Sequence, residues 1–203
     1  MTTIVESFDK IKSNILTAKP EKQVNIVAVS KTFDLDHIKP LIDYGHSHFG
    51  ENKVQEAISK WKEIKKKNKN LKLHMVGKLQ SNKAKNAVEI FEYIHSLDNQ
   101  KLADLLSKNQ VLLNKSLKYF IQVNIGNESQ KSGIPLNELD SFYTYCINEK
   151  KLNVIGLMVI PPNNQNSEKY FKLINDLNKG LALNDLSMGM SSDYLEAIKY
   201  NST

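Results

Sequence analysis

A lysine follows the most apolar short run of the sequence. Residues 26–29 read Ile-Val-Ala-Val, Ser30 closes the run, and Lys31 comes next. We expect residues 24–30 to form a strand that is buried on both faces, with Lys31 partly buried at its carboxyl end. Partial burial lowers the pKa of a lysine, and the neutral amine can form a Schiff base with an aldehyde. An ordinary surface lysine is the alternative, because the chain has 28 basic residues.

A second candidate is the segment Ser-Met-Gly-Met-Ser-Ser-Asp at 187–193. We expect Ser187, Gly189 and Ser191 at a turn between a strand and a helix, where a glycine lets the backbone approach a ligand. A helix that begins near Ser191 would offer amide groups and a dipole that favour an anion. A simple helix cap at 192–193 is the alternative. The segment therefore indicates a phosphate site.

The histidines do not form a metal-binding pattern. His46 and His48 alternate and would share one face of a strand, but no third ligand is placed beside them. His74 and His95 lie near the ends of other expected strands, and we interpret them as hydrogen-bonded and partly buried. We therefore predict no metal site. Asn52 begins an expected helix, where its amide either caps that helix or reaches a ligand.

Short apolar runs alternate along the chain with longer amphipathic stretches. We predict strands at 24–30, 46–50, 71–77, 93–97, 119–125, 152–160 and 185–189. We predict helices at 2–18, 34–44, 52–67, 81–90, 99–115, 135–149, 165–180 and 191–200. Such alternation forms right-handed βαβ units and a parallel sheet, either open and doubly wound or closed as a (β/α)₈ barrel. The barrel is favoured, because no glycine-rich nucleotide-binding loop follows the first strand.

In such a barrel, functional side chains lie at the carboxyl ends of the strands. The segments at those ends are rich in Gly, Ser, Asn, His and Met, and they would meet at one mouth and form a ligand site. These segments are Lys31, 49–52, 74–83, 95–99, 124–133, 158–162 and 187–193.

Composition narrows the partners and the compartment. The chain has 203 residues, enough for a single domain, which we expect to span 1–203. Its net charge of +6 comes from lysine without any arginine, so we predict no nucleic-acid binding. No segment is apolar enough to span a membrane, and no secretory signal is visible at the start. Cys146 is the only cysteine, which favours a reducing compartment, and we expect a cytoplasmic protein.

Several motifs follow one another in a characteristic order. They are AVSKT at 28–32, GHSHFGENKVQE at 45–56, LHMVGKLQSNKAK at 73–85, HSLD at 95–98, QVNIGNESQKSG at 122–133, GLMVIPP at 156–162, LSMGMSSDYLEAI at 186–198 and NST at 201–203. The series resembles the pyridoxal phosphate homeostasis proteins, also called the YggS/PROSC family. The resemblance implies a (β/α)₈ TIM barrel of the alanine racemase N-terminal type. It also implies pyridoxal 5′-phosphate (PLP) held as a Schiff base on Lys31, the lysine of the AVSKT motif.

The resemblance further implies where the cofactor binds. The family's SMGMS and GST segments hold mainly the phosphate, and they correspond to 187–191 and 201–203 in this sequence. Asn52 and His74 would face the same mouth. The expected cofactor-binding residues are therefore Lys31, Asn52, His74, Ser187, Met188, Gly189, Ser191, Ser202 and Thr203.

The sequence departs from the family pattern at its end. That pattern continues past GST into an arginine-containing eighth strand, whereas this sequence ends at Thr203. We therefore expect a barrel without its last strand and helix, in which the first and seventh strands have unpaired edges. We also expect Ser202 and Thr203 to lie on a fraying end.

The resemblance implies a PLP-binding protein without an established reaction and without a catalytic residue. It would act in intracellular PLP homeostasis and in the balance of amino and keto acids. PLP-dependent apo-enzymes are candidate partners, and we expect a monomer. A small PLP-dependent amino-acid racemase or lyase is the alternative, and it needs a proton donor such as His74 or Tyr194. A phosphate-binding barrel with a sugar-phosphate substrate is a third hypothesis.

Overall fold

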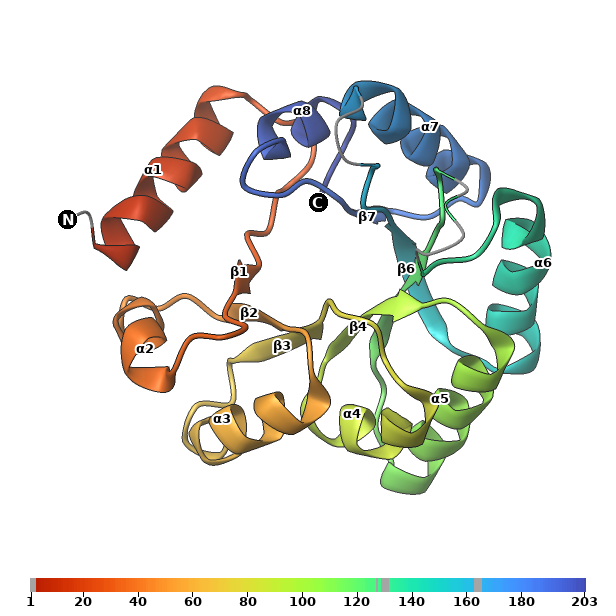
Figure 1. The fold of residues 1–203 in the computed structure, drawn as a ribbon, viewed down its shortest axis with the longest axis horizontal. Helices are drawn as coiled ribbons and strands as arrows, with labels where there is room; N and C mark the ends of the chain where they lie inside the picture. Colours follow the sequence, from red (N-terminus) through yellow and green to blue (C-terminus); the bar gives the residue numbers. More distant parts are fainter. Residues whose placement is uncertain (1–2, 127, 129–131, 163–165) are drawn as a thin grey trace.

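The computed structural model describes residues 3–126, 128, 132–162 and 166–203. Among these residues, seven parallel strands lie side by side in sequence order and form one sheet. The strands are β1 (Ala28–Val29), β2 (His48–Glu51), β3 (Lys72–Met75), β4 (Tyr93–Leu97), β5 (Lys118–Gln122), β6 (Asn153–Met158) and β7 (Asp185–Ser187). The sheet curls into a partial barrel, and the helices lie on its outer side (Figure 1).

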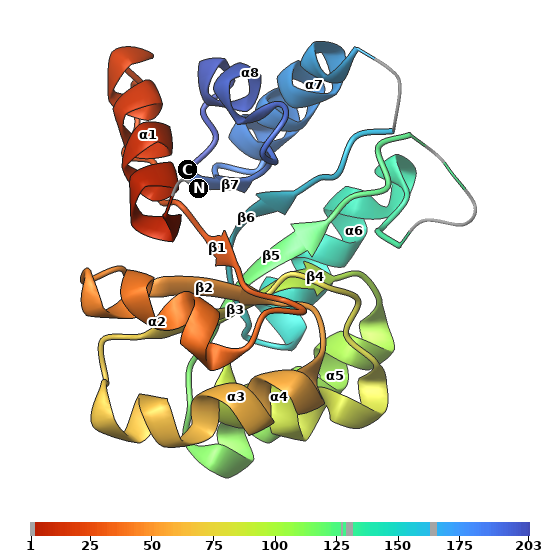
Figure 2. The ribbon, with the colours of Figure 1, turned by 60° about the vertical axis from the view of Figure 1, so that its left-hand side comes forward.

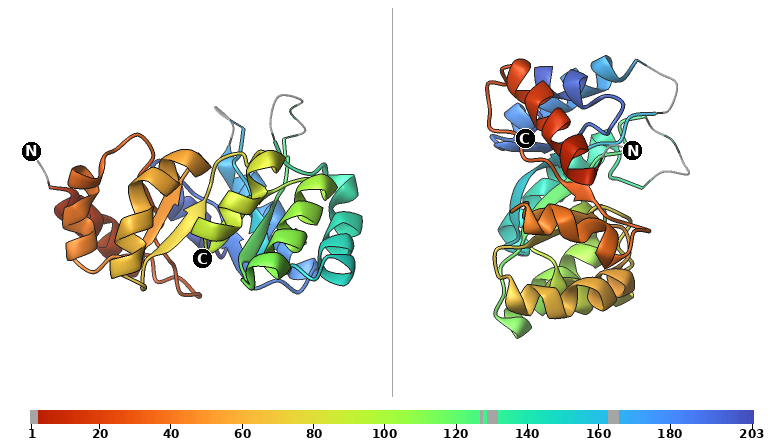
Figure 3. Two further views of the ribbon diagram at one scale, coloured as in Figure 1. Left: turned by 90° about the horizontal axis from the view of Figure 1, so that it is seen from below. Right: turned by 90° about the vertical axis from the view of Figure 1, so that its left-hand side faces the viewer.

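Helices connect the strands and cover the outside of the sheet. They are α1 (Ile4–Thr17), α2 (Leu35–Asp43), α3 (Val54–Lys67), α4 (Ala84–Ile90), α5 (Gln100–Leu113), α6 (Leu139–Thr144), α7 (Ser167–Gly180) and α8 (Tyr194–Lys199). The side chains of Thr3, Asp34 and Asn99 cap the first turns of α1, α2 and α5. Helices α1 and α2 lie at one end of the molecule, and α5 and α6 lie at the other (Figure 3). None of the described helices is long and apolar enough to cross a membrane.

The alternation predicted from the sequence is confirmed. Every expected strand and helix has a counterpart, and β4 covers the predicted residues 93–97. The stretch expected as one helix at 135–149 is divided into a 3₁₀ turn, α6 and a π turn at Tyr145–Glu149. The helix expected at 191–200 begins only at Tyr194, after a turn at 191–193.

Strand β1 differs most from its prediction. Only Ala28 and Val29 pair with β2, and Val29 is 46% exposed. The expectation of a strand over 24–30 that is buried on both faces is therefore wrong. The reason is its place in the sheet: among the described residues, β2 is the one strand that pairs with β1.

The end of the chain lies between β7 and the segment that leads into β1 (Figure 2). Thr203 N donates to Leu186 O at 3.0 Å, and Asn25 N donates to Thr203 O at 2.6 Å. Ser202 is buried, and its Oγ donates to Met188 O at 2.7 Å. The expectation that Ser202 and Thr203 fray is therefore wrong, because hydrogen bonds to the backbone on both sides hold them.

The two faces of the sheet bear different side chains. The outer face packs on the helices and forms the main core, which includes Trp61 of α3 together with Phe49, Leu73, Ile94, Tyr119, Ile121 and Leu157. Side chains alternate along a strand, so the next residue on each strand faces the inside of the curve. The inner face therefore bears His48, His74, Tyr93, His95, Phe120 and Ser187.

Candidate functional site

A row of hydrogen-bonded side chains crosses the inner face of the sheet. His48 Nδ1 lies 2.9 Å from His74 Nε2, and His74 Nδ1 lies 2.8 Å from His95 Nε2. His95 Nδ1 in turn lies 2.6 Å from Ser187 Oγ. The row begins at the first residue of β2 and ends at the last residue of β7. It therefore connects the amino-terminal side of the sheet with its carboxyl-terminal edge.

His74 and His95 are buried against aromatic rings. Tyr93 stacks on His74 with ring centroids 4.2 Å apart, and Phe120 stacks on His95 with centroids 4.4 Å apart. Burial lowers the pKa of His95 to about 3 and lowers the pKa of His74 well below its usual value. Both rings are therefore neutral near pH 7.

Sequence reasoning identified hydrogen-bonded histidines but missed the row that they form. Strand register was the absent signal, because it places His48, His74 and His95 on the same face of three consecutive strands. Within the described part of the chain, no group of three His, Cys, Asp or Glu side chains is placed to hold a metal ion. The histidine rings instead use their nitrogens to bind one another.

The turn after β7 requires a glycine. Gly189 has a φ of +89°, and a Cβ at this position would lie 2.8 Å from Ala197 Cβ and 3.0 Å from Tyr194 Cα. Met190 N donates to Asp193 Oδ1 at 2.6 Å, which closes the turn before α8. Asp193 occupies the N-cap position of α8, but its side chain closes the preceding turn and does not cap the helix. Ser191 is exposed in the same turn, three residues before α8 rather than at its start.

Ser202 and Thr203 lie beside this segment, as the family resemblance implies. Besides the Ser202 bond to Met188 O, Thr203 Oγ1 accepts from Leu186 N at 2.8 Å. Both hydroxyl groups are thus engaged with the backbone at 186–188. Their direct effect is to fix the end of β7, from which Ser187 projects.

Lys31 follows β1 at the carboxyl-terminal edge, and its side chain is exposed. The expectation of partial burial is wrong, because β1 is short and lies at the side of the sheet. Among the described residues, Lys31 Nζ has no hydrogen-bond or ion-pair partner. The preceding residue is firmly held: Ser30 Oγ donates to Glu51 Oε1 at 2.8 Å, and Lys60 Nζ donates to Ser30 O at 2.7 Å.

Asn52 follows β2 and is half-buried. It does not cap α3, since Lys53 occupies the N-cap position and no side chain caps this helix. Gly77, in the segment after β3, approaches Asn52 so closely that a Cβ on it would lie 2.5 Å from Asn52 O. The ends of β2 and β3 are therefore packed together, with His74 beneath them on the inner face.

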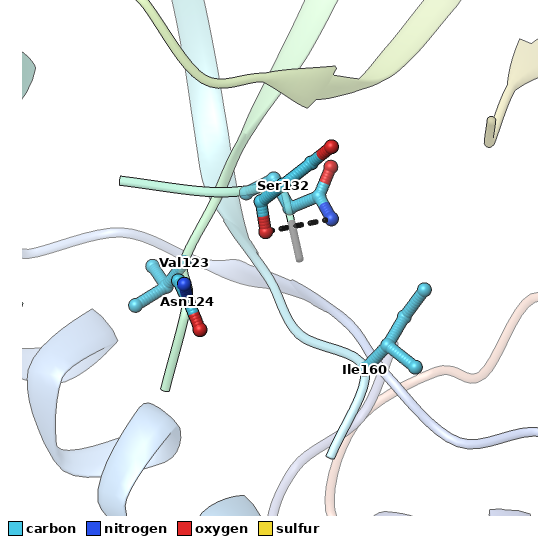
Figure 4. Close-up of a pocket in the computed structure, with 5 residues that line it drawn as sticks. Val123, Asn124, Ser132 and Ile160 are labelled. Carbon is cyan, nitrogen blue, oxygen red and sulfur yellow. Dashed lines mark hydrogen bonds between the residues drawn. The ribbon is translucent and has the colours of Figure 1, made fainter. Parts of the chain in front are cut away.

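A small open pocket of about 200 Å³ lies after β5 and β6. It is lined by Gln122, Val123, Asn124, Ser132 and Ile160 (Figure 4). Gln122 Nε2 donates to Ser132 O at 3.4 Å across one side of it. Residues 127 and 129–131 of the predicted mouth segment 124–133 lie outside the described residues.

The predicted site residues mostly lie at one edge of the sheet. The carboxyl ends of parallel strands share that edge, so the segments that follow β1, β2 and β7 open on the same side. Lys31, Asn52 and 187–191 occupy these positions, whereas His74 lies deeper on the inner face. An exposed amine and a serine- and glycine-rich turn thus border one mouth.

Comparison with known proteins places the chain among relatives. A family model described as alanine racemase, N-terminal domain, matches residues 7–203. The pyridoxal phosphate homeostasis protein of Pasteurella multocida is 37% identical over 216 residues, which cover 99% of this chain and 93% of that protein. The chain belongs to the pyridoxal phosphate homeostasis protein family. The Escherichia coli protein of that family is 31% identical, with 100% of this chain and 93% of that protein covered.

Solved structures agree with membership of the pyridoxal phosphate homeostasis protein family. PipY of Synechococcus elongatus without PLP gives a TM-score of 0.87 at 33% identity, over 99% of this chain and 95% of PipY. PipY with PLP bound gives 0.83 at 33% identity, over 95% of each chain. Alanine racemase of Clostridium difficile gives 0.69 at 12% identity, over 90% of this chain and 50% of the enzyme, which shows the fold alone. The predicted family and the predicted partial barrel are confirmed.

Proposed function

We propose that this protein binds PLP as a Schiff base on Lys31 and acts in PLP homeostasis without catalysing a reaction of its own. The exposed and unpartnered amine of Lys31 at the carboxyl-terminal edge carries the proposal. Family membership supports it, because PipY has been solved with PLP bound. When bound, PLP supplies an aldehyde, and its condensation with the lysine amine releases one water molecule.

The chemistry of the donor set fits a phosphate held by neutral groups. Ser187 and Ser191 provide hydroxyl groups, and Gly189 has no room for a side chain. The sequence contains no arginine that could form a bidentate contact. We assign the phosphate to the segment 187–191, which includes Met188, and we place Ser202 and Thr203 behind it as the groups that fix its backbone.

Two further residues would border the rest of the cofactor. Asn52 is half-buried at the end of β2, close to the mouth that Lys31 also borders. His74 lies beneath it on the inner face, where both ring nitrogens are already hydrogen-bonded. We therefore propose that Asn52 contacts the cofactor directly and that His74 supports the floor of the site.

The contacts of the two candidate proton donors, His74 and Tyr194, support a binding role rather than racemase or lyase activity. Both nitrogens of His74 bond to other histidines, and burial lowers its pKa. The Tyr194 hydroxyl accepts from Asn14 Nδ2 of α1 at 3.0 Å, so it lies among the outer helices and not on the inner face of the sheet. A racemase needs a group that can deliver a proton to bound substrate, and these contacts support neither side chain in that role.

The proposal also covers the partners, the cellular compartment and the oligomeric state of the protein. An exposed Lys31 would let an acceptor protein reach bound PLP, which supports transfer to PLP-dependent apo-enzymes and an effect on amino- and keto-acid balance. Cys146 is a buried free thiol, in keeping with a cytoplasmic protein, and we propose that it works there as a monomer.

Absorbance and retention of PLP test the proposal. Wild-type protein mixed with PLP should show Schiff-base absorbance and retain PLP through dialysis, and Lys31→Ala should lose both. Lys78→Ala is the matched control, since Lys78 is an exposed lysine in the segment after β3, and it should behave as wild type. Added amino acids should produce no exchange of the α-proton.

Equal PLP retention by Lys31→Ala would refute the assignment, and α-proton exchange would favour the racemase or lyase. Absence of Schiff-base absorbance in the wild type would favour a sugar-phosphate barrel.

A further inference from the structure

In the row His48–His74–His95–Ser187, the tautomer of each histidine depends on the tautomer of its neighbour. Each link joins two atoms that can both accept a proton, so each link needs one hydrogen between them. A neutral imidazole has one N–H, on Nδ1 or on Nε2. Burial keeps His74 and His95 neutral near pH 7. The position of one hydrogen therefore dictates the positions of the others.

Only two arrangements satisfy every link when the three rings are neutral. In the first, each ring bears hydrogen on Nδ1, so His48 donates to His74, His74 donates to His95, and His95 donates to Ser187 Oγ. In the second, each ring bears hydrogen on Nε2, and Ser187 donates to His95 Nδ1. Any mixture of the two leaves one link with two hydrogens or with none, which is costly for buried groups.

The two arrangements differ in what Ser187 offers to the mouth. In the first, the serine oxygen accepts from His95, so the hydroxyl hydrogen remains available for another acceptor. In the second, the Ser187 hydroxyl donates its hydrogen bond to His95 Nδ1, and its oxygen can only accept from a ligand. An anion needs a donor, so an anion next to Ser187 favours the first arrangement.

We propose that His48, His74 and His95 share one tautomer and that an anion bound at Ser187 sets it to Nδ1–H in all three rings. His95 is then a positioning residue, which turns the Ser187 hydroxyl toward the anion. The inference rests on the proposed function in one respect, that the PLP phosphate is the anion beside Ser187.

Protonation of His48, at the other end of the row, also depends on the tautomers of the three rings. With hydrogen on Nδ1, His48 keeps a lone pair on Nε2, and a proton there is compatible with the first arrangement alone. A proton on His48 and an anion at Ser187 therefore favour each other. Burial and the charges of Lys72 and Lys118 lower the pKa of His48. His46 faces the same end through its Nε2, which donates to His48 O at 2.8 Å, and Tyr93 and His74 are the other titratable rings beside His48.

Nitrogen NMR of the full chain labelled with ¹⁵N-histidine reads the tautomers directly. With PLP bound, the proposal predicts Nδ1–H in His48, His74 and His95 and a higher pKa for His48 than in the free protein. Pyridoxal, which has no phosphate, is the matched control ligand and should leave the pKa of His48 unchanged. Rings in different tautomers, or Nε2–H in His95 with PLP bound, would overturn the proposal. If PLP fails to bind at all, the proposed function fails instead.

Three variants separate positioning from simple packing. Ser187→Ala should bind PLP more weakly and, at saturating PLP, should show no shift in the pKa of His48. His95→Leu removes the donor to Ser187 and should weaken PLP binding about tenfold, the value of one hydrogen bond to a charged group. His95→Asn retains an amide donor near the place of Nδ1 and should recover most of that loss, while the link to His74 is broken. Equal weakening by Asn and Leu, with both variants folded by circular dichroism, would contradict the positioning role.

Discussion

One buried carboxylate oxygen of Glu51 fixes the position of the residue that precedes Lys31. Its Oε1 accepts from Ser30 Oγ, from Lys60 Nζ at 2.8 Å and from Trp61 Nε1 at 2.9 Å. Lys60 also donates to the carbonyl of Ser30. The backbone that leads into Lys31 is thus fixed from β2 and α3, although Lys31 itself is exposed. An exposed amine on a fixed backbone is compatible with the covalent bond proposed above.

Glu51→Ala tests this anchoring. The change leaves the ammonium of Lys60, whose side chain is 12% exposed, without its carboxylate. We expect a loss of about 3 kcal/mol in the free energy of unfolding, since removing one partner of a buried pair strands the other charge. Urea denaturation measures it. Glu56→Ala is the control, because its pair with Lys53 is exposed, and it should change stability little. Equal stabilities of the two variants would contradict the anchoring role.

Gly189→Ala tests the turn after β7. A Cβ there meets Ala197 Cβ at 2.8 Å, and the φ of +89° is unfavourable for any L side chain. We expect a loss of about 2 kcal/mol in stability, together with weaker PLP binding because the segment 187–191 must shift.

A glycine elsewhere in the chain provides the control for this substitution. A Cβ on Gly180, at the end of α7, would meet nothing within 4 Å. Gly180→Ala should therefore leave PLP binding unchanged and should raise stability by up to about 1 kcal/mol. A neutral Gly189→Ala in denaturation and in PLP titration would show that the turn does not need its present shape.

At the scale of elements, the sequence predicts order and type well and boundaries less well. Strand β4 matches its prediction because it lies inside the sheet, with a strand on each side. Strand β1 fails because its neighbours in the sheet, not its own composition, decide burial, and Val29 is exposed. The late start of α8 follows from the Met190–Asp193 bond, a local contact that periodicity does not contain.

The location of a site residue was predictable where it depends only on the residue's place at the end of a strand. Lys31, Asn52 and 187–191 lie at the carboxyl-terminal edge because each follows a parallel strand. The histidine row was not predictable, since it depends on the register of four strands and on the curl that brings β7 toward β4. Exposure of Lys31 likewise depends on where β1 lies in the sheet.

At the scale of the whole molecule, the buried histidines couple stability to pH. The pKa of His95 falls to about 3 in the folded state, below the ordinary value of 6.5, and the pKa of His74 falls in the same direction. Below pH 6.5 the unfolded chain binds protons that the folded chain does not. Stability is therefore lost as pH falls from 6.5 toward 3, at about 1.4 kcal/mol per pH unit for each such histidine.

His95→Asn isolates this contribution. Urea denaturation at pH 7, 6 and 5 should show a smaller loss of stability with falling pH than in the wild type, by about one proton. His37→Asn, at an exposed histidine on α2, is the control and should follow the wild-type curve. If His95→Asn shows the same pH dependence as the wild type, His95 is not the buried neutral group described above.

Mass spectrometry can locate the proposed covalent bond between PLP and Lys31. Wild-type protein is loaded with PLP, reduced with borohydride and digested, and the modified peptide is sequenced. We expect a single pyridoxyl adduct on the peptide that contains Lys31, because the proposed Schiff base places one PLP on one amine of each chain. An adduct on Lys78, Lys83 or any other lysine, or a wild-type protein that retains PLP but yields no adduct, would contradict it.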